Sequence, residues 1–134
     1  MHTAIATPWT AAVTLLALVL HAVVTAIAGR ARARYAIKAP AVTGNEQFER
    51  AYRVQMNTIE QMVFFVPALW LCAVLLSDAG AAVAGLVWVI ARGLYAIAYL
   101  KDPASRGPWA GVSVVVQFAL LIGAIAGLAR SLIG

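Results

Sequence analysis

The sequence contains few charged residues and few groups that bind metals. Only 11% of its 134 residues are charged, five residues are acidic, and there are one cysteine and two histidines. The lone Cys72 has no cysteine with which to form an intrachain disulfide. It also has no Cys or His partner at metal-ligand spacing, so the sequence predicts no metal site. Because Cys72 lies within an apolar run, we interpret it as a small residue that packs between helices.

Hydrophobic residues dominate what remains. They make up 63% of the chain, and the mean hydropathy is +0.89. A soluble domain of this size has too little interior to hide so much apolar surface. The net charge is +5, and most of the basic residues lie beside the apolar spans. No nucleic-acid motif is present. We therefore interpret the positive charge as a topology signal and a contact with membrane lipids, and we predict no nucleic-acid partner.

Four apolar spans predict an all-α fold, a transmembrane four-helix bundle that forms one domain over residues 1–134. The expected helices lie at about 7–34, 45–76, 81–101 and 107–130. Connections this short make neighbouring helices antiparallel, so the bundle runs up-down-up-down. The spacing of Thr43 and Glu46 is that of a capping box, which predicts that the second helix begins near residue 45.

Basic residues are distributed unequally between the two ends of these helices. Eight flank the first and third connections, and only Arg130 lies at the other end; the eight are Arg30, Arg32, Arg34, Lys38, Arg50, Arg53, Lys101 and Arg106. The positive-inside rule then predicts cytoplasmic basic connectors and two non-cytoplasmic termini in a multi-pass membrane protein. Both a bacterial inner membrane and an internal eukaryotic membrane fit this arrangement.

Two sets of polar residues recur at helical spacing within the spans: Arg53, Asn57 and Glu60 in the second, and Arg92, Tyr95 and Tyr99 in the third. Each set shares one face of its helix. An ionised group at membrane depth needs a partner or water. One interpretation is an ion pair between Glu60 and Arg92 that joins the two helices. The other is a polar pocket for a small zwitterion of net negative charge.

These residues belong to runs that resemble a known family. The segment 48–60, Phe-Glu-Arg-Ala-Tyr-Arg-Val-Gln-Met-Asn-Thr-Ile-Glu, and the third-helix segment from Ala91 through Tyr95 to Tyr99, followed by Arg106, are similar to the membrane-associated proteins in eicosanoid and glutathione metabolism (MAPEG). The likeness extends from about residue 30 to 111 and is greatest to the leukotriene synthase and microsomal glutathione transferase branch. In two places the chain departs from that branch. Gln61 replaces a tyrosine, and Ala33 replaces a second arginine.

The resemblance implies a homotrimer that binds glutathione between adjacent subunits near the cytoplasmic surface. The residues it implies for glutathione are Arg32, Arg53, Gln55, Asn57, Glu60, Tyr95 and Tyr99, with Arg32 at a carboxylate. It implies that the catalytic residue is Arg106, which faces the sulfur, and it implies no metal. The activity would be that of a glutathione transferase acting on a lipophilic electrophile, with reduction of lipid hydroperoxides as a second reaction.

Two other functions remain compatible with the sequence. One is a non-catalytic lipid-binding scaffold of the same family, in which Arg106 is a topology residue of the loop. The other is a small multidrug-type transporter, which also uses four helices and a membrane glutamate. The positions of Arg53 and Asn57 beside Glu60 argue against a lone proton-coupled carboxylate.

Overall fold

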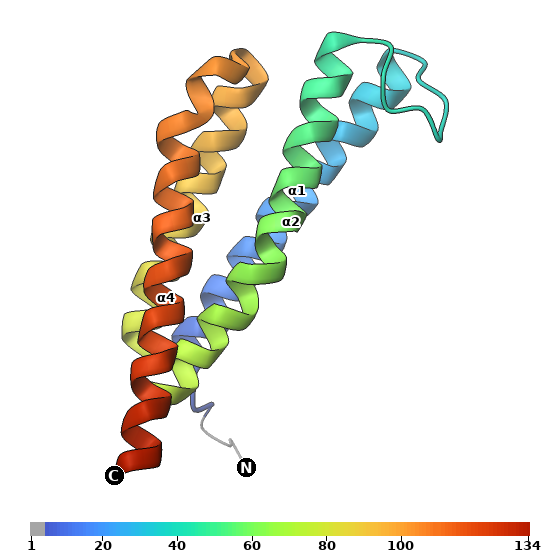
Figure 1. Ribbon diagram of the computed structural model, residues 1–134. Coiled ribbons are helices and arrows are strands. Elements are labelled where there is room, and N and C mark those ends of the chain that lie inside the picture. The colour runs from blue at the N-terminus through green and yellow to red at the C-terminus, as the bar shows by residue number, and fades with distance from the viewer. Residues whose placement is uncertain (1–4) are drawn as a thin grey trace.

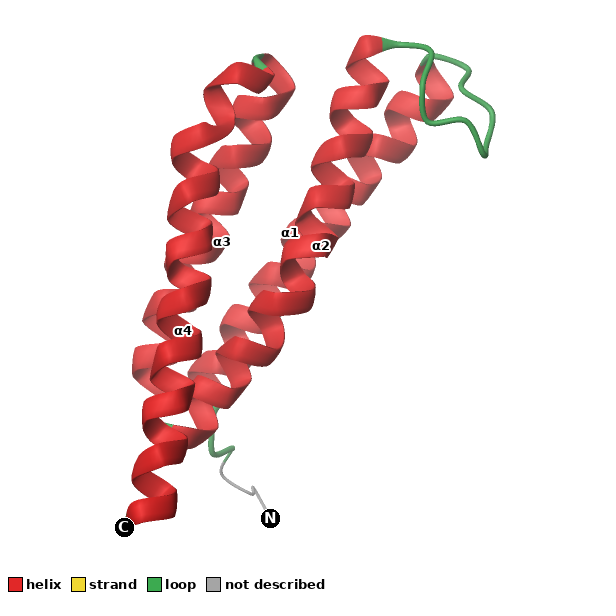
Figure 2. Cartoon of the chain, in the orientation of Figure 1, coloured by secondary structure: helices red, strands yellow, loops and turns green. Residues whose placement is uncertain are grey.

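The computed structural model describes residues 5–134 as four long helices (Figure 1). They are α1 (Pro8–Arg34), α2 (Glu46–Leu75), α3 (Asp78–Lys101) and α4 (Gly107–Ile133), and a short 3-10 helix, η1 (Pro103–Arg106), precedes α4. The described part of the chain contains no strand (Figure 2). Each long helix is long and apolar enough to cross a membrane. The predicted all-α, four-helix transmembrane fold is therefore confirmed.

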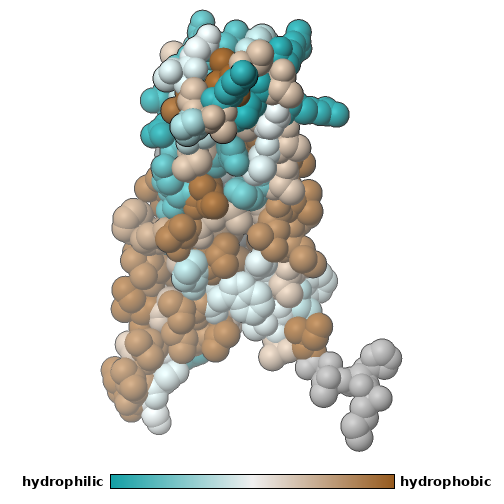
Figure 3. All heavy atoms as spheres, turned by 90° about the vertical axis from the view of Figure 1, so that its right-hand side faces the viewer, coloured by the Kyte–Doolittle hydropathy of each residue, from teal (hydrophilic) through white to brown (hydrophobic). Residues whose placement is uncertain are grey.

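The helices form two antiparallel pairs, α1 with α2 and α3 with α4. Figure 1 shows the two connections within the pairs at one end of the molecule, and the start of α1 and the end of α4 at the other. The pairs lie close together near the α2–α3 turn and separate toward the connector end. Hydrophilic side chains gather at that connector end, whereas apolar side chains cover most of the remaining face (Figure 3).

Aromatic packing fills the centre of the bundle. The ring of Phe65 in α2 stacks on the indole of Trp88 in α3, with ring centroids 3.9 Å apart and planes inclined by 2°. Trp88 Nε1 donates to Oε1 of Gln117 in α4 at 2.9 Å. A buried indole N–H needs an acceptor, and this bond supplies one while it joins α3 to α4. Trp70 Nε1 makes a similar link to Thr14 Oγ1 in α1 at 3.0 Å.

The helix ends differ in detail from the sequence-based expectation. The capping box at Thr43 is wrong: Asn45 caps α2, and its side chain accepts from the backbone N–H of Phe48 at 3.1 Å. An amide oxygen directly before the helix reaches this N–H, so no side chain farther upstream is needed. Ser77 caps α3 by accepting from the N–H of Gly80, and α3 therefore begins at Asp78, three residues before the expected start.

Candidate functional site

Polar residues of α2 and α3 meet near the connector end of the bundle. Asn57 Nδ2 donates to the hydroxyl oxygen of Tyr95 at 2.8 Å. The ring of Tyr95 lies against that of Tyr99, one turn later on α3, with centroids 5.7 Å apart. Arg53, one turn before Asn57, extends the same face of α2 toward the connectors. Helical spacing on two neighbouring elements thus brings four of the predicted site residues together.

Arg106 joins this group from η1. Its Nη1 donates to the carbonyl oxygen of Pro103 at 2.7 Å, which fixes the side chain within its own turn. Its guanidinium carbon lies 5.4 Å from the centre of the Tyr99 ring. The side chain of Arg106 remains exposed, so the guanidinium is accessible from solution as well as from the group of α2 and α3 residues.

These residues line one cavity of about 320 Å³. Its lining comes from α2, α3, η1 and the start of α4: Arg53, Asn57, Gln61, Arg92, Tyr95, Tyr99, Arg106, Ala110 and Val114. Three of the nine side chains are guanidiniums and none is acidic. Guanidiniums bind carboxylates through paired hydrogen bonds and remain charged at any physiological pH. The cavity, called the anion cavity below, is therefore suited to a ligand with more than one anionic group.

Arg92 is buried at this cavity, with only 3% of its surface exposed. Its guanidinium carbon lies 4.0 Å from the centre of the Tyr95 ring, a cation–π contact. Of the two interpretations, the ion pair between Glu60 and Arg92 is wrong, because Glu60 is exposed and the described residues contain a single ion pair, between Glu46 and Arg50. Glu60 is also absent from the lining of the anion cavity, to which Arg92 belongs.

Two other predicted residues, Gln55 and Arg32, lie at a second cavity, of about 330 Å³, and Glu60 lines neither of the two cavities. Gln55 follows Arg53 by two residues, about 200° around the helix, and therefore faces another direction. With it lie Arg32 of α1 and the aromatic residues Phe48 and Tyr52. Arg32 packs 4.7 Å above the Phe48 ring, and its Nη1 donates to the carbonyl oxygen of Ala41 at 2.8 Å. This second set is called the Arg32 cavity below.

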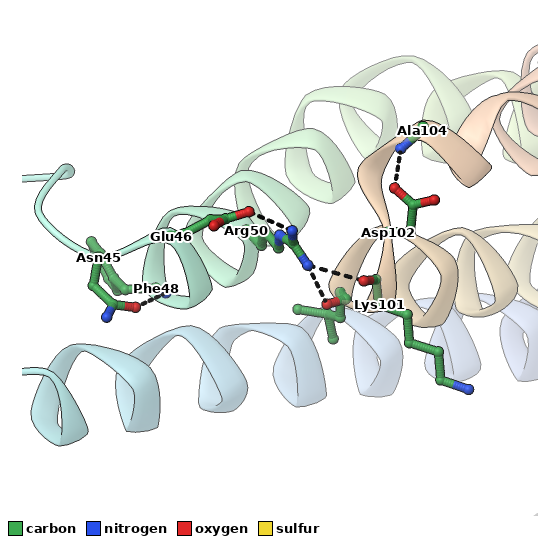
Figure 4. A network of polar contacts seen from close by, with 8 residues as sticks. Asn45, Glu46, Phe48, Arg50, Lys101, Asp102 and Ala104 are labelled. Carbon is green, nitrogen blue, oxygen red and sulfur yellow. Dashed lines mark hydrogen bonds and ion pairs between the residues drawn. The ribbon is translucent and has the colours of Figure 1, made fainter.

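An arginine clamp holds α2 to the segment that carries Arg106. Arg50 Nη1 donates to the carbonyl oxygens of Leu100 at 3.3 Å and Lys101 at 3.0 Å, at the end of α3 (Figure 4). Asp102 then accepts from the N–H of Ala104 and starts η1. Carbonyls at a helix end lack partners within the helix, so a neighbouring guanidinium satisfies them. The clamp ties α2 to the end of α3, directly before η1.

Several lining residues were not among those predicted. Gln61 lies four residues after Asn57, so the same helical spacing that selected Arg53 and Asn57 also points to it. Tyr52 and Phe48 precede Gln55 by three and seven residues, a weaker signal because their aromatic rings are equally suited to the core. Among the described residues, no group of three or more His, Cys, Asp or Glu side chains could hold a metal ion.

The chain is similar to known proteins over most of its length. The MAPEG family model matches residues 10–126. The uncharacterized protein sll1147 of Synechocystis sp. is 43% identical over 117 residues, which cover 87% of this chain and 85% of that protein. Microsomal glutathione S-transferase 2 of Homo sapiens is 34% identical over 104 residues (77% and 70%). Leukotriene C4 synthase of Cavia porcellus is 35% identical over 96 residues (72% and 64%).

Proposed function

Because the chain belongs to the MAPEG family, we propose that it is a glutathione transferase of the membrane, which activates the glutathione thiolate for conjugation to a lipophilic electrophile. Two of the relatives above are named for glutathione transfer and for leukotriene C4 synthesis. The observation that carries the proposal is the anion cavity, with three guanidiniums and no acidic lining residue.

The charges of glutathione fit this lining. The tripeptide carries two carboxylates, one ammonium and a thiol, and the thiolate form adds a third negative charge. A free thiol has a pKa of about 8.5, so only a minor fraction is thiolate at neutral pH. A guanidinium beside the sulfur favours the thiolate because it stabilises the negative charge and keeps its own proton. Arg106 is the guanidinium we place beside the sulfur, and Arg53 and Asn57 bind the peptide.

The two cavities support a site shared between subunits. Arg32 and Gln55 face away from Arg53 within one subunit, yet all three are expected to contact one small ligand. A second copy that brings its Arg32 cavity against the anion cavity resolves this, and repetition of the contact around a threefold axis gives a closed homotrimer.

Glu60 supports the same assembly. It is exposed on α2 beside the exposed side chains of Ile59 and Val63. A carboxylate on an apolar surface facing lipid costs several kcal/mol unless it is paired or hydrated. A neighbouring subunit would cover this face and leave Glu60 near the bound tripeptide, where it pairs with the glutathione ammonium. We place the basic connectors, and therefore the site, on the cytoplasmic side.

The proposed reaction is a nucleophilic substitution or addition at carbon. The thiol proton passes to water as glutathione binds, and the thiolate attacks the electrophilic carbon that enters from the bilayer. A sulfur–carbon bond forms while the leaving group departs or a ring opens, and the product is a thioether. The protein supplies orientation and fixed positive charge, which do not have to reorganise during the reaction.

The test is conjugation of glutathione to 1-chloro-2,4-dinitrobenzene by protein purified in detergent. We expect Arg106→Ala to lower the rate at saturating glutathione by about 100-fold, the usual loss when a preorganised charge is removed from a reacting centre. Lys101→Ala is the matched control, because it removes an exposed cation from the end of α3, five residues before Arg106, and its rate should stay within about twofold.

Calorimetry with glutathione separates the alternatives. A folded protein that binds no glutathione would overturn the proposal. Glutathione binding with no conjugation in the unmodified protein would favour the lipid-binding scaffold. Equal rates for the unmodified protein and Arg106→Ala would assign Arg106 to topology alone.

A further inference from the structure

Arg92 has a feature that packing of the bundle does not explain. Its side chain is buried in the apolar part of α3, and its Nε and Nη2 atoms have no hydrogen-bond partner. The guanidinium reaches neither the exposed Glu60 nor any acidic residue in the lining of the anion cavity. Its central carbon instead lies 4.0 Å from the centre of the Tyr95 ring, over the ring face.

Such an arrangement does not favour stability of the subunit. Burial removes the hydration of a charged group, and a cation–π contact returns only part of that loss. Replacement of buried charges by apolar side chains of similar volume is often neutral or stabilising. An unpartnered charge that lines a cavity instead indicates a ligand whose own charge completes the site.

Tyr95 contacts Arg92 through its ring and also lines the anion cavity. The Tyr95 oxygen accepts from Asn57 Nδ2, which leaves its O–H free to donate toward the cavity. A cation against the ring face withdraws electron density from the phenol, and this makes the O–H a stronger donor. The same field also stabilises negative charge in the cavity directly.

We propose that Arg92 is a positioning residue that acts through Tyr95: its buried guanidinium polarises the Tyr95 hydroxyl, which donates to the thiolate of bound glutathione. This inference rests on the proposed function and adds a second contribution to thiolate formation beside that of Arg106. The other charged or titratable groups that line the cavity are Arg53 from α2, Tyr99 from α3 and Arg106 from η1, and α4 contributes only Ala110 and Val114.

The first readout is the pH at which half of the bound glutathione is thiolate, measured by thiolate absorbance at saturating glutathione. We expect Arg92→Met to raise this midpoint by about one pH unit, since one opposite charge at this range has an effect of that order. Arg92→Lys, which retains the charge, should recover most of the shift. Tyr95→Phe should raise the midpoint similarly, and Arg92→Met combined with Tyr95→Phe should add little.

The second readout is the Tm without glutathione, because replacing an arginine whose role is structural would lower it. Arg92→Met should keep or raise the Tm, because it removes a buried charge whose Nε and Nη2 atoms have no hydrogen-bond partner. Arg50→Met is the matched control: it removes another arginine that is largely covered, but it deletes the bonds to the Leu100 and Lys101 carbonyls, and its Tm should fall.

The outcomes separate this inference from the proposed function. An unmodified protein without a thiolate signal overturns both. A normal thiolate signal whose midpoint is unchanged in Arg92→Met overturns the role of Arg92 alone. Additive shifts in the double variant would mean that Arg92 does not act through Tyr95. A Tm loss in Arg92→Met equal to that in Arg50→Met, with no midpoint shift, would identify Arg92 as a structural residue.

Discussion

At the residue scale, two arginines near the same end of the bundle have different surroundings. Arg50 donates to the carbonyls that end α3 and pairs with Glu46. Arg92 contacts the ring of Tyr95 and has two nitrogens without partners. Arg50 therefore joins α2 to the end of α3, whereas Arg92 contributes positive charge to the anion cavity. Residue type alone does not distinguish these roles, because both are arginines within predicted helices.

Asp78 provides a stabilising contact between distant parts of the chain. Its carboxylate accepts from the backbone N–H groups of Trp9, at 3.2 Å, and Thr10, at 2.9 Å, so the first turn of α3 caps the first turn of α1. The N-cap residue of α1, Thr7, makes no side-chain cap bond of its own, and the first turn of α1 contains no acidic residue.

We predict that Asp78→Ala lowers the Tm by about 5 °C, because both cap bonds and the charge–dipole attraction are lost. The measurement is thermal unfolding in detergent. Glu49→Ala, which removes an exposed carboxylate from the first turn of α2, should change the Tm by only about 1 °C. Equal effects of the two substitutions would contradict the assignment of the cap.

Helical spacing in the sequence predicted which polar residues share one face of a helix but not which of them touch across helices. Arg53, Asn57, Tyr95 and Tyr99 were predictable, since helical spacing places them on two faces of adjacent antiparallel helices. The Glu60–Arg92 pair was wrong because a shared depth does not specify how each helix is rotated about its axis. The burial of Arg92 against Tyr95 also depends on that rotation, which side-chain packing across α2 and α3 determines.

At the element scale, α4 packs closely against the end of α2, and this packing restricts the rotation of α4 about its own axis. A Cβ atom built on Gly127 would lie 2.5 Å from the carbonyl oxygen of Leu75, so only glycine fits there without a shift of the backbone. Small residues let membrane helices approach closely enough for extensive contact. A Cβ atom added to Gly111, on the same helix, would meet no atom within 4 Å.

We expect Gly127→Ala to destabilise the bundle by about 1–3 kcal/mol, because the added methyl must push α4 away from α2. Gly111→Ala should be neutral or stabilising by up to about 1 kcal/mol, since alanine favours the helix and meets no neighbour within the subunit. Thermal unfolding of both variants tests the difference. A Gly127→Ala protein as stable as Gly111→Ala would show that the two helices do not pack this closely.

At the scale of the whole molecule, the four spans and their antiparallel order follow from hydropathy and short connections. The division of the candidate site into two cavities does not, because it arises from how the helices are rotated within the subunit. Arg32 and Gln55 lie at one cavity and Arg106 at the other. We propose that one ligand contacts both cavities because a second subunit supplies the missing half.

Mixed trimers test this sharing. We predict that Arg32→Ala and Arg106→Ala proteins are each nearly inactive at low glutathione concentration. Differently tagged copies, co-expressed and purified through both tags, should regain about one third of the unmodified activity, because every mixed trimer around a threefold axis has one interface with both arginines intact. Mixed assemblies no more active than the parent variants would mean that both arginines act from one subunit.

Thiolate formation on the protein tests directly whether Arg106 activates glutathione. Glutathione is titrated at neutral pH into the detergent-purified protein and into Arg106→Ala, and the thiolate absorbance is recorded. We expect a saturable thiolate signal in the unmodified protein that is lost in Arg106→Ala. Saturable glutathione binding without a thiolate signal, or a signal of equal size in Arg106→Ala, would contradict it.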